Sequence, residues 1–395
     1  MSILSVIFWL SVFIVCYSYI GYGVLLYLAI RVKRLLQGNP ADKPAAFVPD
    51  VTFLVAAYNE EDFIGEKIKN SLAMDYPAGK IQFIFVTDGS TDNTNEIISQ
   101  HPQVKLLYDP QRKGKMAAVN RAMGFVTTPF VVLSDANTLL NPAAVSLLMQ
   151  RFADDKVGAV AGEKKVMSTT GGAEAQGEGM YWKYESLLKK WDAELYSVMG
   201  AAGELIAIRT SLYEHQQEDT ILDDFMISFR INMKGYTVMY EPAAYAMETS
   251  SASLQEEYKR KVRISAGGFQ SMGRLLPLLN PFRYPRITWQ YISHRVLRWT
   301  LAPLSLLLAL VSNILLILLG AGTIIYMITG LLQLLFYAAA LTGYLLARKH
   351  IKAKYFYIPF YFVFMNVAVY IGCIRFFRKR QSAVWERAQR SIAVQ

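Results

Sequence analysis

Short apolar runs alternate with amphipathic stretches from Val51 to about Ser250. The runs are rich in β-branched residues and end at turn-forming residues, which predicts strands, and apolar positions at helical spacing between them predict helices. The predicted strands are Val51–Ala57, Ile81–Asp88, Val104–Asp109 and Phe130–Asp135. The predicted helices lie near Glu60–Leu72, Asn93–Gln100 and Lys115–Gly124. This alternation is typical of an α/β domain with a parallel, doubly wound sheet.

Longer apolar runs lie on both sides of this domain. Ile3–Ile30 carries no charged residue, is long enough to cross a bilayer, and is followed by the basic run Arg31–Arg34. Because the positive charges follow the run, it predicts an uncleaved anchor with the N-terminus outside and residue 31 onward in the cytoplasm. Leu301–Ala347 is long enough for two crossings and Tyr355–Cys373 for one more. We therefore expect four crossings.

The segment before the last crossings has a mixed composition. Pro281–Trp299 places arginines among tyrosines and tryptophans, which is typical of a helix at the membrane interface. The predicted divisions are 1–34 (anchor), 48–250 (α/β domain), 251–299 (interfacial helices), 300–375 (transmembrane helices) and 376–395 (basic tail). Arg348–Lys354 and Arg375–Arg380 are both basic, although a crossing between them puts one outside. We give more weight to the crossing count, because the charge rule weakens toward the C-terminus.

The composition agrees with a membrane protein. The chain of 395 residues is 53% apolar and only 18% charged, which is less charged than a typical soluble domain. Its net charge of +10 suits anionic lipid better than nucleic acid. The sequence contains no compact basic module of the kind that binds nucleic acid, and the basic residues flank apolar segments. Cys16 and Cys373 lie in apolar runs at opposite ends, and the four histidines are scattered, so neither a disulfide framework nor a zinc site is expected.

Polar clusters follow several predicted strands. They are 57–60, 87–92 and 134–137. Because ligands of such sheets bind outside the carboxyl ends of the strands, these clusters would face one crevice. Asp135 and Asn137 offer oxygen atoms on alternate positions, which suits Mg²⁺ or Mn²⁺ held together with substrate phosphates. Arg112–Lys115 places cations before a helix, where a diphosphate would bind. A turn or a helix cap explains each cluster alone, but together they favour a nucleotide site.

A second pair of acids occurs at Asp223 and Asp224, before the apolar positions of another predicted helix. Carboxylates at a helix start are stabilised by the helix dipole, and a capping role explains one of them. Two adjacent carboxylates also repel each other, which can raise the pKa of one of them toward working pH, a shift that is not read from a sequence.

The motifs together resemble those of the inverting family 2 glycosyltransferases, which have a GT-A, Rossmann-like fold. They are Ala57-Tyr58-Asn59-Glu60, Asp88-Gly89-Ser90-x-Asp92, Gly114-Lys115-x-x-Ala118-x-Asn120 and Asp135-x-Asn137. The membrane-bound branch is most similar: the hyaluronan, chitin, cellulose and poly-N-acetylglucosamine synthases. The resemblance covers roughly residues 50 to 300. It implies an integral protein of the inner (cytoplasmic) membrane, with its catalytic domain in the cytoplasm.

The resemblance also implies roles for single residues. The donor nucleotide would contact Ala56, Tyr58, Glu60, Asp88, Lys115 and Asn120. Asp135 and Asn137 would hold Mg²⁺ or Mn²⁺, and Asn137 stands where a second acid is usual, so it brings no charge. Asp224, next to Asp223, would be the general base of an inverting transfer, and Arg263 would pair with the leaving diphosphate.

The acceptor side departs from the family pattern. In the place of the Gln-x-x-Arg-Trp motif of processive synthases, Arg260 stands for the glutamine and Ile264 for the tryptophan. Gln176–Leu195 predicts an amphipathic helix whose aromatic stripe fits a buried face and also suits sugar stacking. Gly203 lies in a small-residue passage that fits either tight packing or close approach to a sugar. The acceptor candidates are Glu163, Tyr181, Trp182, Trp191, Gly203 and Ile264.

We therefore expect a membrane-integrated inverting glycosyltransferase that uses a nucleotide-sugar donor, with uridine as the expected nucleoside. The acceptor is a growing β-linked polysaccharide or, as the alternative, a lipid-linked or other membrane acceptor that receives a single sugar. The expected partners are this donor, a saccharide or lipid-linked acceptor and membrane lipid, with no nucleic acid. A nucleotidyltransferase is disfavoured because its glycine-rich signature is not seen. A transporter would leave the combination of Asp135 and Asp224 unexplained.

Overall fold

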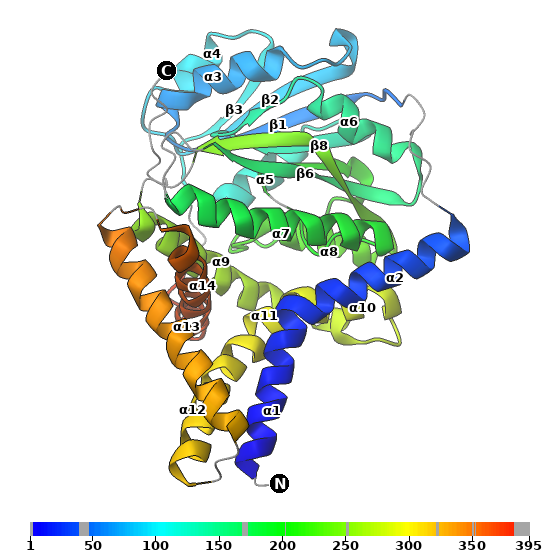
Figure 1. Cartoon of the computed structure of the whole chain (residues 1–395). Helices are drawn as coiled ribbons and strands as arrows, with labels where there is room; N and C mark the ends of the chain where they lie inside the picture. The colour runs from blue at the N-terminus through cyan, green and yellow to red at the C-terminus, as the bar shows by residue number, and fades with distance from the viewer. Residues whose placement is uncertain are drawn as a thin grey trace.

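A computed structural model describes residues 3–38, 47–167, 173–201, 203–249, 253–320, 324–349, 351 and 353–382, without the side chains of 167–181 and Lys354. The α/β domain lies at one end of the molecule, and helices α1, α12 and α13 extend away from it (Figure 1). The N-terminus lies at the far end of these helices. An α/β domain joined to an elongated helical part agrees with the fold class expected from the sequence.

The predicted strands form one half of the sheet, with the predicted bounds. They are β1 (Val51–Ala57), β2 (Ile81–Asp88), β3 (Val104–Asp109) and β4 (Phe130–Asp135). All are parallel, in the order β3-β2-β1-β4. The register aligns Ala56 with both Val86 and Asp135, so the polar ends of the strands lie at one edge.

The other half of the sheet is mixed, so the prediction of a wholly parallel sheet is wrong here. Its strands are β7 (Leu205–Arg209), β6 (Val157–Met167), β8 (Thr237–Thr249) and β5 (Leu139–Leu140). β7 is antiparallel to β4 and β6, whereas β6 and β8 are parallel. The chain enters β7 beside Ser134, near the carboxyl end of β4, and must therefore run back along it.

Helices cover both faces of the sheet. They are α3 (Glu61–Leu72), α4 (Thr94–Ser99), α5 (Lys115–Met123), α6 (Ala144–Gln150), α7 (Ala173–Leu195) and α8 (Asp223–Met233), with short 3₁₀ turns at Ala78–Lys80, Arg151–Ala153 and Thr210–Leu212. Alternate strand residues enter two different cores. Phe53 and Val55 pack with α3 and α6, whereas Leu54 and Ala56 pack with α5 and α8. This alternation is the normal consequence of a pleated strand.

The N-terminal apolar run is divided into two helices. α1 (Ile3–Cys16) and α2 (Tyr22–Gln37) are joined by a π-helical turn, Tyr17–Gly21, and run in different directions (Figure 1). Tyr22, Leu26 and Ile30 of α2 pack against Leu188 of α7, so α2 lies along the α/β domain. The anchor predicted at Ile3–Ile30 is therefore bent beside the domain.

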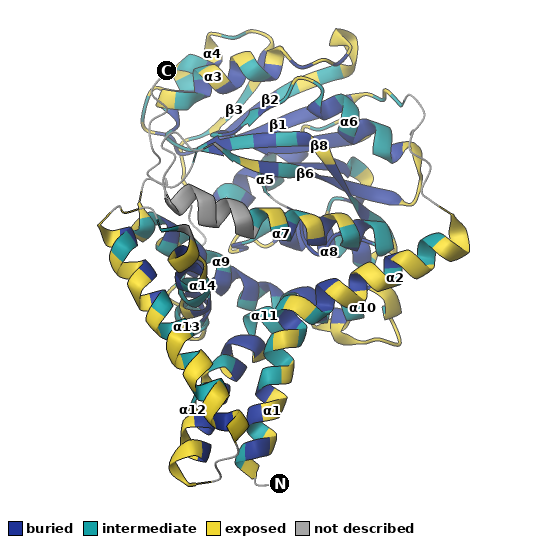
Figure 2. Ribbon diagram, in the orientation of Figure 1, coloured by how far each residue is buried: buried dark blue, intermediate teal, exposed yellow. Residues whose placement is uncertain are grey.

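The C-terminal part consists of consecutive helices. They are α9 (Leu254–Arg274), a 3₁₀ turn (Leu276–Leu279), α10 (Pro285–Tyr291), a π turn (Ile292–Val296), α11 (Leu297–Trp299), α12 (Leu301–Leu318), α13 (Ile324–Arg348) and α14 (Lys354–Phe377). Within the described part of the chain, four helices are long and apolar enough to cross a membrane, as the sequence predicted. Exposed residues cover much of α12 and α13 (Figure 2), including Leu304, Leu331 and Leu334. Such surfaces suit contact with lipid.

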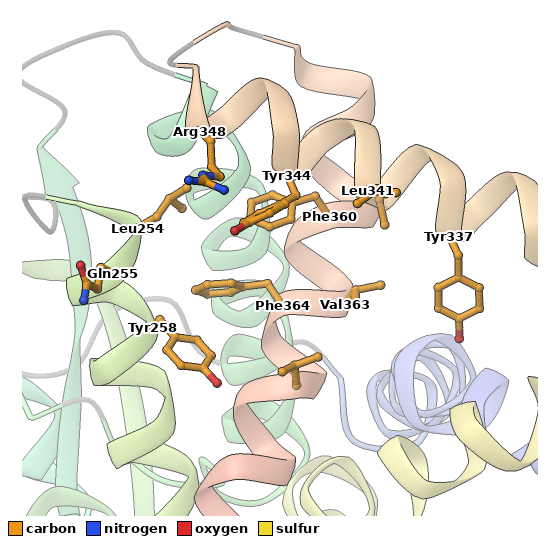
Figure 3. Close-up of a pocket in the computed structure, with 12 residues that line it drawn as sticks. Leu254, Gln255, Tyr258, Tyr337, Leu341, Tyr344, Arg348, Phe360, Val363 and Phe364 are labelled. Carbon is orange, nitrogen blue, oxygen red and sulfur yellow. The ribbon is translucent and has the colours of Figure 1, made fainter.

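α14 lies alongside α9 over most of its length. The ring centroids of Tyr258 and Phe364 are 5.6 Å apart, and those of Phe269 and Phe376 are 6.3 Å apart. A Cβ atom on Gly372 would lie 2.5 Å from Cβ of Ser265, so only glycine allows this approach. Figure 3 shows the first half of this pairing.

Other contacts of α14 lie at the domain ends of α1 and α12. Tyr19 donates a hydrogen bond of 2.8 Å to Oδ1 of Asn366, and Tyr370 donates one of 2.5 Å to the carbonyl oxygen of Pro303. Neither contact lies at the far ends of α1 and α12. The described length of α14 therefore lies beneath the α/β domain.

A buried network joins α7 to the N-terminal and interfacial helices. We call it the junction network; its residues are Tyr22, Glu185, Asp192, His294, Arg295 and Arg298. His294 bonds Asp192 through Nδ1 (2.6 Å) and Glu185 through Nε2 (3.1 Å). Arg295 pairs with Glu185 at 2.9 Å, and Tyr22 donates a hydrogen bond to Asp192. The network fixes the α/β domain on the helical part.

Candidate active site

The carboxyl ends of the parallel strands hold a lysine between two aspartates. Nζ of Lys115 lies 2.7 Å from Oδ1 of Asp135 and 2.9 Å from Oδ2 of Asp223. Asp135 ends β4, Lys115 begins α5, and Asp223 begins α8. Together with Gly203 and Asp224, they line one small cavity. The structure thus brings together Asp135 and the acid pair Asp223 and Asp224, which lie almost ninety residues apart in the sequence.

Asp88 fixes the loop that delivers Lys115. Its two carboxylate oxygens accept backbone N–H bonds from Lys113 (2.9 Å) and Gly114 (2.6 Å). Gly114 has φ of 102°, a conformation that other residues rarely adopt, and it directly precedes α5. Asp88 is buried, so its visible role is to position this loop beside the predicted donor site.

Asp224 has the properties of a general base. Burial and the neighbouring Asp223 carboxylate raise the pKa of Asp224 to about 7. Burial alone would also raise the pKa of Asp223, but the Lys115 ammonium brings it below its usual value. A Cβ atom on Gly203 would lie 3.6 Å from Cγ of Asp224, an ordinary contact distance, so residue 203 lies directly beside the carboxylate. A base whose pKa lies near 7 is well matched to proton abstraction.

A buried lysine lies behind β4 and was not identified from the sequence. Nζ of Lys67 donates hydrogen bonds of 2.8 Å to Oγ of Ser134 and to the carbonyl oxygen of Thr138. These residues flank Asp135 and Asn137, so Lys67 holds the tip of the strand in place. Burial lowers the pKa of Lys67 to about 7. Its only sequence signal is a position on the apolar face of α3.

Asp135 and Asn137 form a small set of oxygen donors. Burial raises the pKa of Asp135, although the Lys115 ammonium acts against this. No group of three or more metal-binding side chains occurs within the described ranges. The two oxygen donors fit a divalent ion that keeps waters and is completed by substrate phosphates. The lysine between Asp135 and Asp223 shows that this position favours positive charge.

α9 carries Arg263 to the site. The Arg263 charge helps to lower the pKa of Asp223, so the two groups are within electrostatic reach. Nε of Arg263 is buried, and no hydrogen-bond partner for it occurs among the described residues. α9 is fixed to the loop before Asp223, because Oε1 of Gln270 accepts a 3.0 Å bond from N of Ile221. The guanidinium thus has donor capacity to offer a substrate anion.

The predicted nucleoside side of the crevice lies at the ends of β1 and β2. The Arg112 guanidinium lies 3.8 Å from the centre of the Tyr58 ring. Asn59, with φ of 51°, accepts a 2.9 Å bond from N of Thr91 and ties the two loops together. Glu60 is buried, and its N–H bonds Oγ1 of Thr94. Tyr58 and Glu60 therefore lie on a well-ordered rim.

Asn120 bonds a neighbouring loop. Its Nδ2 donates to the carbonyl oxygen of Gln216 (2.7 Å), and its Oδ1 accepts from the hydroxyl of Tyr213 (2.6 Å). These bonds use much of the hydrogen-bonding capacity of the amide. In this structure Asn120 positions the loop. A contact between Asn120 and the donor nucleotide remains a prediction.

The acceptor candidates are divided between different surroundings. Glu163 is half-buried and accepts a 2.7 Å bond from Oγ of Ser186. The Trp182 ring lies 5.4 Å from Nζ of both Lys164 and Lys261. Trp191 instead packs against Tyr27 of α2, with ring centroids 5.3 Å apart, so it is not brought to the site.

For two further acceptor candidates, Ile264 and Tyr181, the structure gives little information on contacts. Ile264 is half-buried on α9, one residue beyond Arg263. The side chain of Tyr181 lies outside the described residues.

Lys164 and its two acidic partners were also not identified from the sequence. Lys164 pairs with Glu204, next to Gly203, and with Glu248 of β8. Burial alone would raise the pKa of Glu204, but Lys164 lowers it to about 2. The three residues come from separate segments, so only the fold reveals the cluster. The ion pair with Lys164 holds Glu204, and therefore also the preceding residue Gly203, beside Asp224.

The mixed sheet and the acid–lysine cluster at its strand ends define a glycosyltransferase with the GT-A fold. Residues 49–267 match the family model described as glycosyltransferase like family 2. Because this match covers more than half of the 395 residues, the chain belongs to that family.

Curated relatives extend the similarity. The chain is 26% identical over 284 residues to a poly-beta-1,6-N-acetyl-D-glucosamine synthase of Staphylococcus aureus, covering 69% of this chain and 67% of the relative. It is 24% identical over 291 residues to the synthase of the same name from Staphylococcus epidermidis, covering 68% and 69%.

A solved structure has a similar fold. The mannosyltransferase of Pyrobaculum calidifontis, in complex with GDP-Man and Mn²⁺, aligns with a TM-score of 0.71 at 22% identity. The alignment covers 96% of this chain and all of that one. The shared architecture thus includes the helical part as well as the α/β domain.

Proposed function

We propose that the protein transfers a sugar from a UDP-linked donor to a growing β-linked polysaccharide, with inversion at the transferred carbon. The observation that carries this proposal is the Asp224 carboxylate, whose pKa of about 7 and position beside Gly203 suit a general base. The similarity to poly-beta-1,6-N-acetyl-D-glucosamine synthases supports an N-acetylhexosamine or hexose as the sugar and a polysaccharide as the product.

In this mechanism Asp224 removes the proton of the attacking acceptor hydroxyl. The new bond forms on the face opposite the leaving diphosphate, so no covalent sugar intermediate is needed. The guanidinium of Arg263, whose Nε has no described partner, donates to the departing diphosphate. Lys115 holds Asp223 charged, and this neighbouring charge raises the pKa of Asp224, although the Lys115 ammonium itself acts in the opposite direction.

Asp135 and Asn137 would hold Mg²⁺ or Mn²⁺ together with the donor phosphates. The bound ion would supply positive charge to the leaving group. Tyr58, Glu60 and Asp88 lie on the ordered rim where the nucleoside would bind. Because Asn137 is neutral, metal affinity should depend more on the donor phosphates than on the protein.

The protein would be integrated in the inner membrane with its α/β domain in the cytoplasm. α1, α12 and α13 would cross the bilayer. α14, which the sequence analysis counts as the fourth crossing and which is also long and apolar enough to cross, would instead lie in the interface beside α9. The contacts of Asn366 and Tyr370 at the domain ends of α1 and α12 support this arrangement. It also places both basic flanks of α14 on the cytoplasmic side, in agreement with the charge rule.

Cysteine labelling tests this topology in a chain whose own two cysteines are replaced by serine. A cysteine at Ser382 should react on the same side as one at Asp155, an exposed residue of the α/β domain. A cysteine at Leu319, which is exposed at the far end of α12, should react on the other side. If the Ser382 variant behaves as the Leu319 variant does, α14 crosses the membrane.

One observation favours the alternative of single-sugar addition. Ile264 follows Arg263 on α9 and offers no aromatic ring for an acceptor sugar. A transferase with this residue would release its acceptor more readily after each step.

One assay tests donor, metal and product together. Purified protein in detergent is offered UDP-N-acetylglucosamine, UDP-glucose and GDP-mannose, each with Mg²⁺, Mn²⁺ or a chelator. Release of UDP together with a ladder of products supports the proposal, and single additions support the alternative. Release of pyrophosphate, or turnover of GDP-mannose alone, would contradict it.

A further inference from the structure

A groove separate from the acid cluster lies between α9, α13 and α14 (Figure 3). Its volume is about 760 Å³, which lies within the usual range of about 300–1,000 Å³ for ligand sites. The wall includes Tyr258 of α9, Leu341 and Tyr344 of α13, and Phe360 and Phe364 of α14. It is therefore mostly apolar and aromatic.

The groove continues the outward face of α13. Leu341 is 59% exposed and Tyr344 is 41% exposed, although both line the groove. Leu345, one turn beyond Leu341, is also exposed and lies outside the groove. In the proposed membrane arrangement the groove therefore opens directly to lipid.

One end of the groove carries a positive charge. Arg348, at the end of α13, lines the groove, and its guanidinium lies 5.8 Å from the ring centre of Tyr344. Among the described residues, no carboxylate pairs with Arg348 within 4.0 Å. Leu254, which begins α9 directly after the α/β domain, lines the same end. This end lies at the domain side of the helices, where lipid headgroups would be.

We propose that this groove binds one anionic phospholipid. The headgroup phosphate, whose charge is not balanced by a choline group, pairs with Arg348, and an acyl chain lies along Leu341, Phe360 and Phe364. The position of an arginine above an apolar wall that is open to lipid matches the polarity of such a molecule. This inference rests on the membrane arrangement proposed above, but it is independent of the sugar and the acceptor.

The first test counts lipids that remain on the purified, detergent-solubilised protein by native mass spectrometry. The delipidated protein is then offered phosphatidylglycerol or phosphatidylcholine with the same acyl chains. We expect one tightly held phosphatidylglycerol and about tenfold weaker retention in Arg348→Gln, as loss of one charge-assisted hydrogen bond implies. Arg31→Gln, an equal charge change on the exposed face of α2, should retain lipid as the wild type does.

A second pair of variants tests the apolar wall. Leu341→Trp fills the groove and should reduce binding of both lipids, whereas Leu345→Trp adds the same ring outside it and should not. Both positions are exposed, and circular dichroism checks that each variant is folded. Equal retention of the two lipids by the wild type, unchanged retention in Arg348→Gln, or recovery of a lipid-linked saccharide in place of the phospholipid would overturn the proposal. Failure of membrane integration itself would appear earlier, as protein extracted without detergent.

Discussion

The acids of the active site are half-buried, those of the junction network are fully buried, and the two sets have different partners. In the active site, Asp224 forms no ion pair with any described residue, and the adjacent Asp223 repels its charge. Its pKa rises to about 7 as a result of burial and this repulsion. The proton on Asp224 can therefore be gained or lost near neutral pH.

In the junction network each acid has several partners. Asp192 bonds His294, Tyr22 and Nε2 of Gln290. Burial by itself would raise the pKa of Glu185, but Arg295 and His294 hold it well below its usual value. The Glu185 carboxylate therefore stays charged, and the hydrogen bonds of Asp192 hold the network in one geometry.

The difference separates two uses of buried charge. A carboxylate surrounded by donors and cations fixes a geometry, and its removal exposes those partners to an unfavourable environment. A carboxylate left beside another acid is costly to the fold and is kept where chemistry requires it. Variants in the two regions should therefore change different measurements.

The largest effect on catalysis is expected for Asp224→Asn. The amide cannot accept the proton of the acceptor, so turnover should fall by about 10²–10⁴-fold, the range typical of general bases. UDP binding should be retained, because Asp224 does not pair with Lys115. Turnover and UDP affinity are measured on the same purified protein, with Glu218→Gln, outside the acid cluster, as a surface control. Near-normal turnover would exclude Asp224 as the base.

Asp135→Ala should weaken binding of the donor nucleotide rather than slow the proton transfer. Without this carboxylate, the divalent ion loses its one charged ligand in the predicted set, and metal-dependent binding of UDP should be lost. Asn137→Asp adds a charge at the same tip and should tighten metal binding. Calorimetric titration of UDP with and without Mn²⁺ measures both effects. Equal affinity with and without metal in the wild type would contradict the predicted metal site.

Asp192→Asn should change stability and leave the chemistry intact. Removal of one member of a buried charged group typically costs about 3–5 kcal/mol, because the groups that bond the Asp192 carboxylate lose their charged acceptor. The melting temperature in detergent should fall clearly, whereas turnover of the folded fraction at low temperature should stay close to that of the wild type. A loss of turnover without loss of stability would mean that the junction network acts in catalysis.

A pH profile sharpens the comparison. Asp224 works as a base only when deprotonated, so kcat should rise as pH increases through about 7. Below its ordinary pKa of about 4 the group is protonated in both the folded and unfolded states. Between about 4 and 7 only the folded state keeps the proton, so the stabilisation that it contributes is lost as pH rises through 7. Thermal melting of the wild type and Asp224→Asn over this range tests the sign.

The sequence was sufficient for the strands that carry the site. Each combines an apolar run with a polar end, and this local pattern predicted the bounds of β1 and β4. The direction of β7 was not predictable, because it depends on where a long insertion returns to the sheet. Lys67 and Lys164 were missed for a related reason. Their partners lie far away in the chain, so nothing local distinguishes them from other lysines.

The same limit applies to the aromatic acceptor candidates. On the sequence, Trp182 and Trp191 belong to one helix and had similar standing. The fold separates them, because Trp191 packs on Tyr27 of α2, whereas Trp182 lies among the lysines near Glu204. Phe269, an aromatic residue of α9 close to Ile264 in the sequence, stacks on Phe376 of α14.

The smallest effect therefore concerns product length. With Ile264 in place of an aromatic residue, an acceptor sugar has to find its stacking surface elsewhere, and Trp182 is the best-placed remaining tryptophan among these candidates. A sugar–aromatic contact of about 0.5–1.5 kcal/mol corresponds to products roughly two- to tenfold shorter in Trp182→Ala. Trp191→Ala should lower the melting temperature and leave the length distribution unchanged, because its ring packs on α2. Gel analysis of labelled products compares both variants with the wild type. If Trp191→Ala shortens the products and Trp182→Ala does not, the acceptor follows the N-terminal helix instead of the passage beside Gly203.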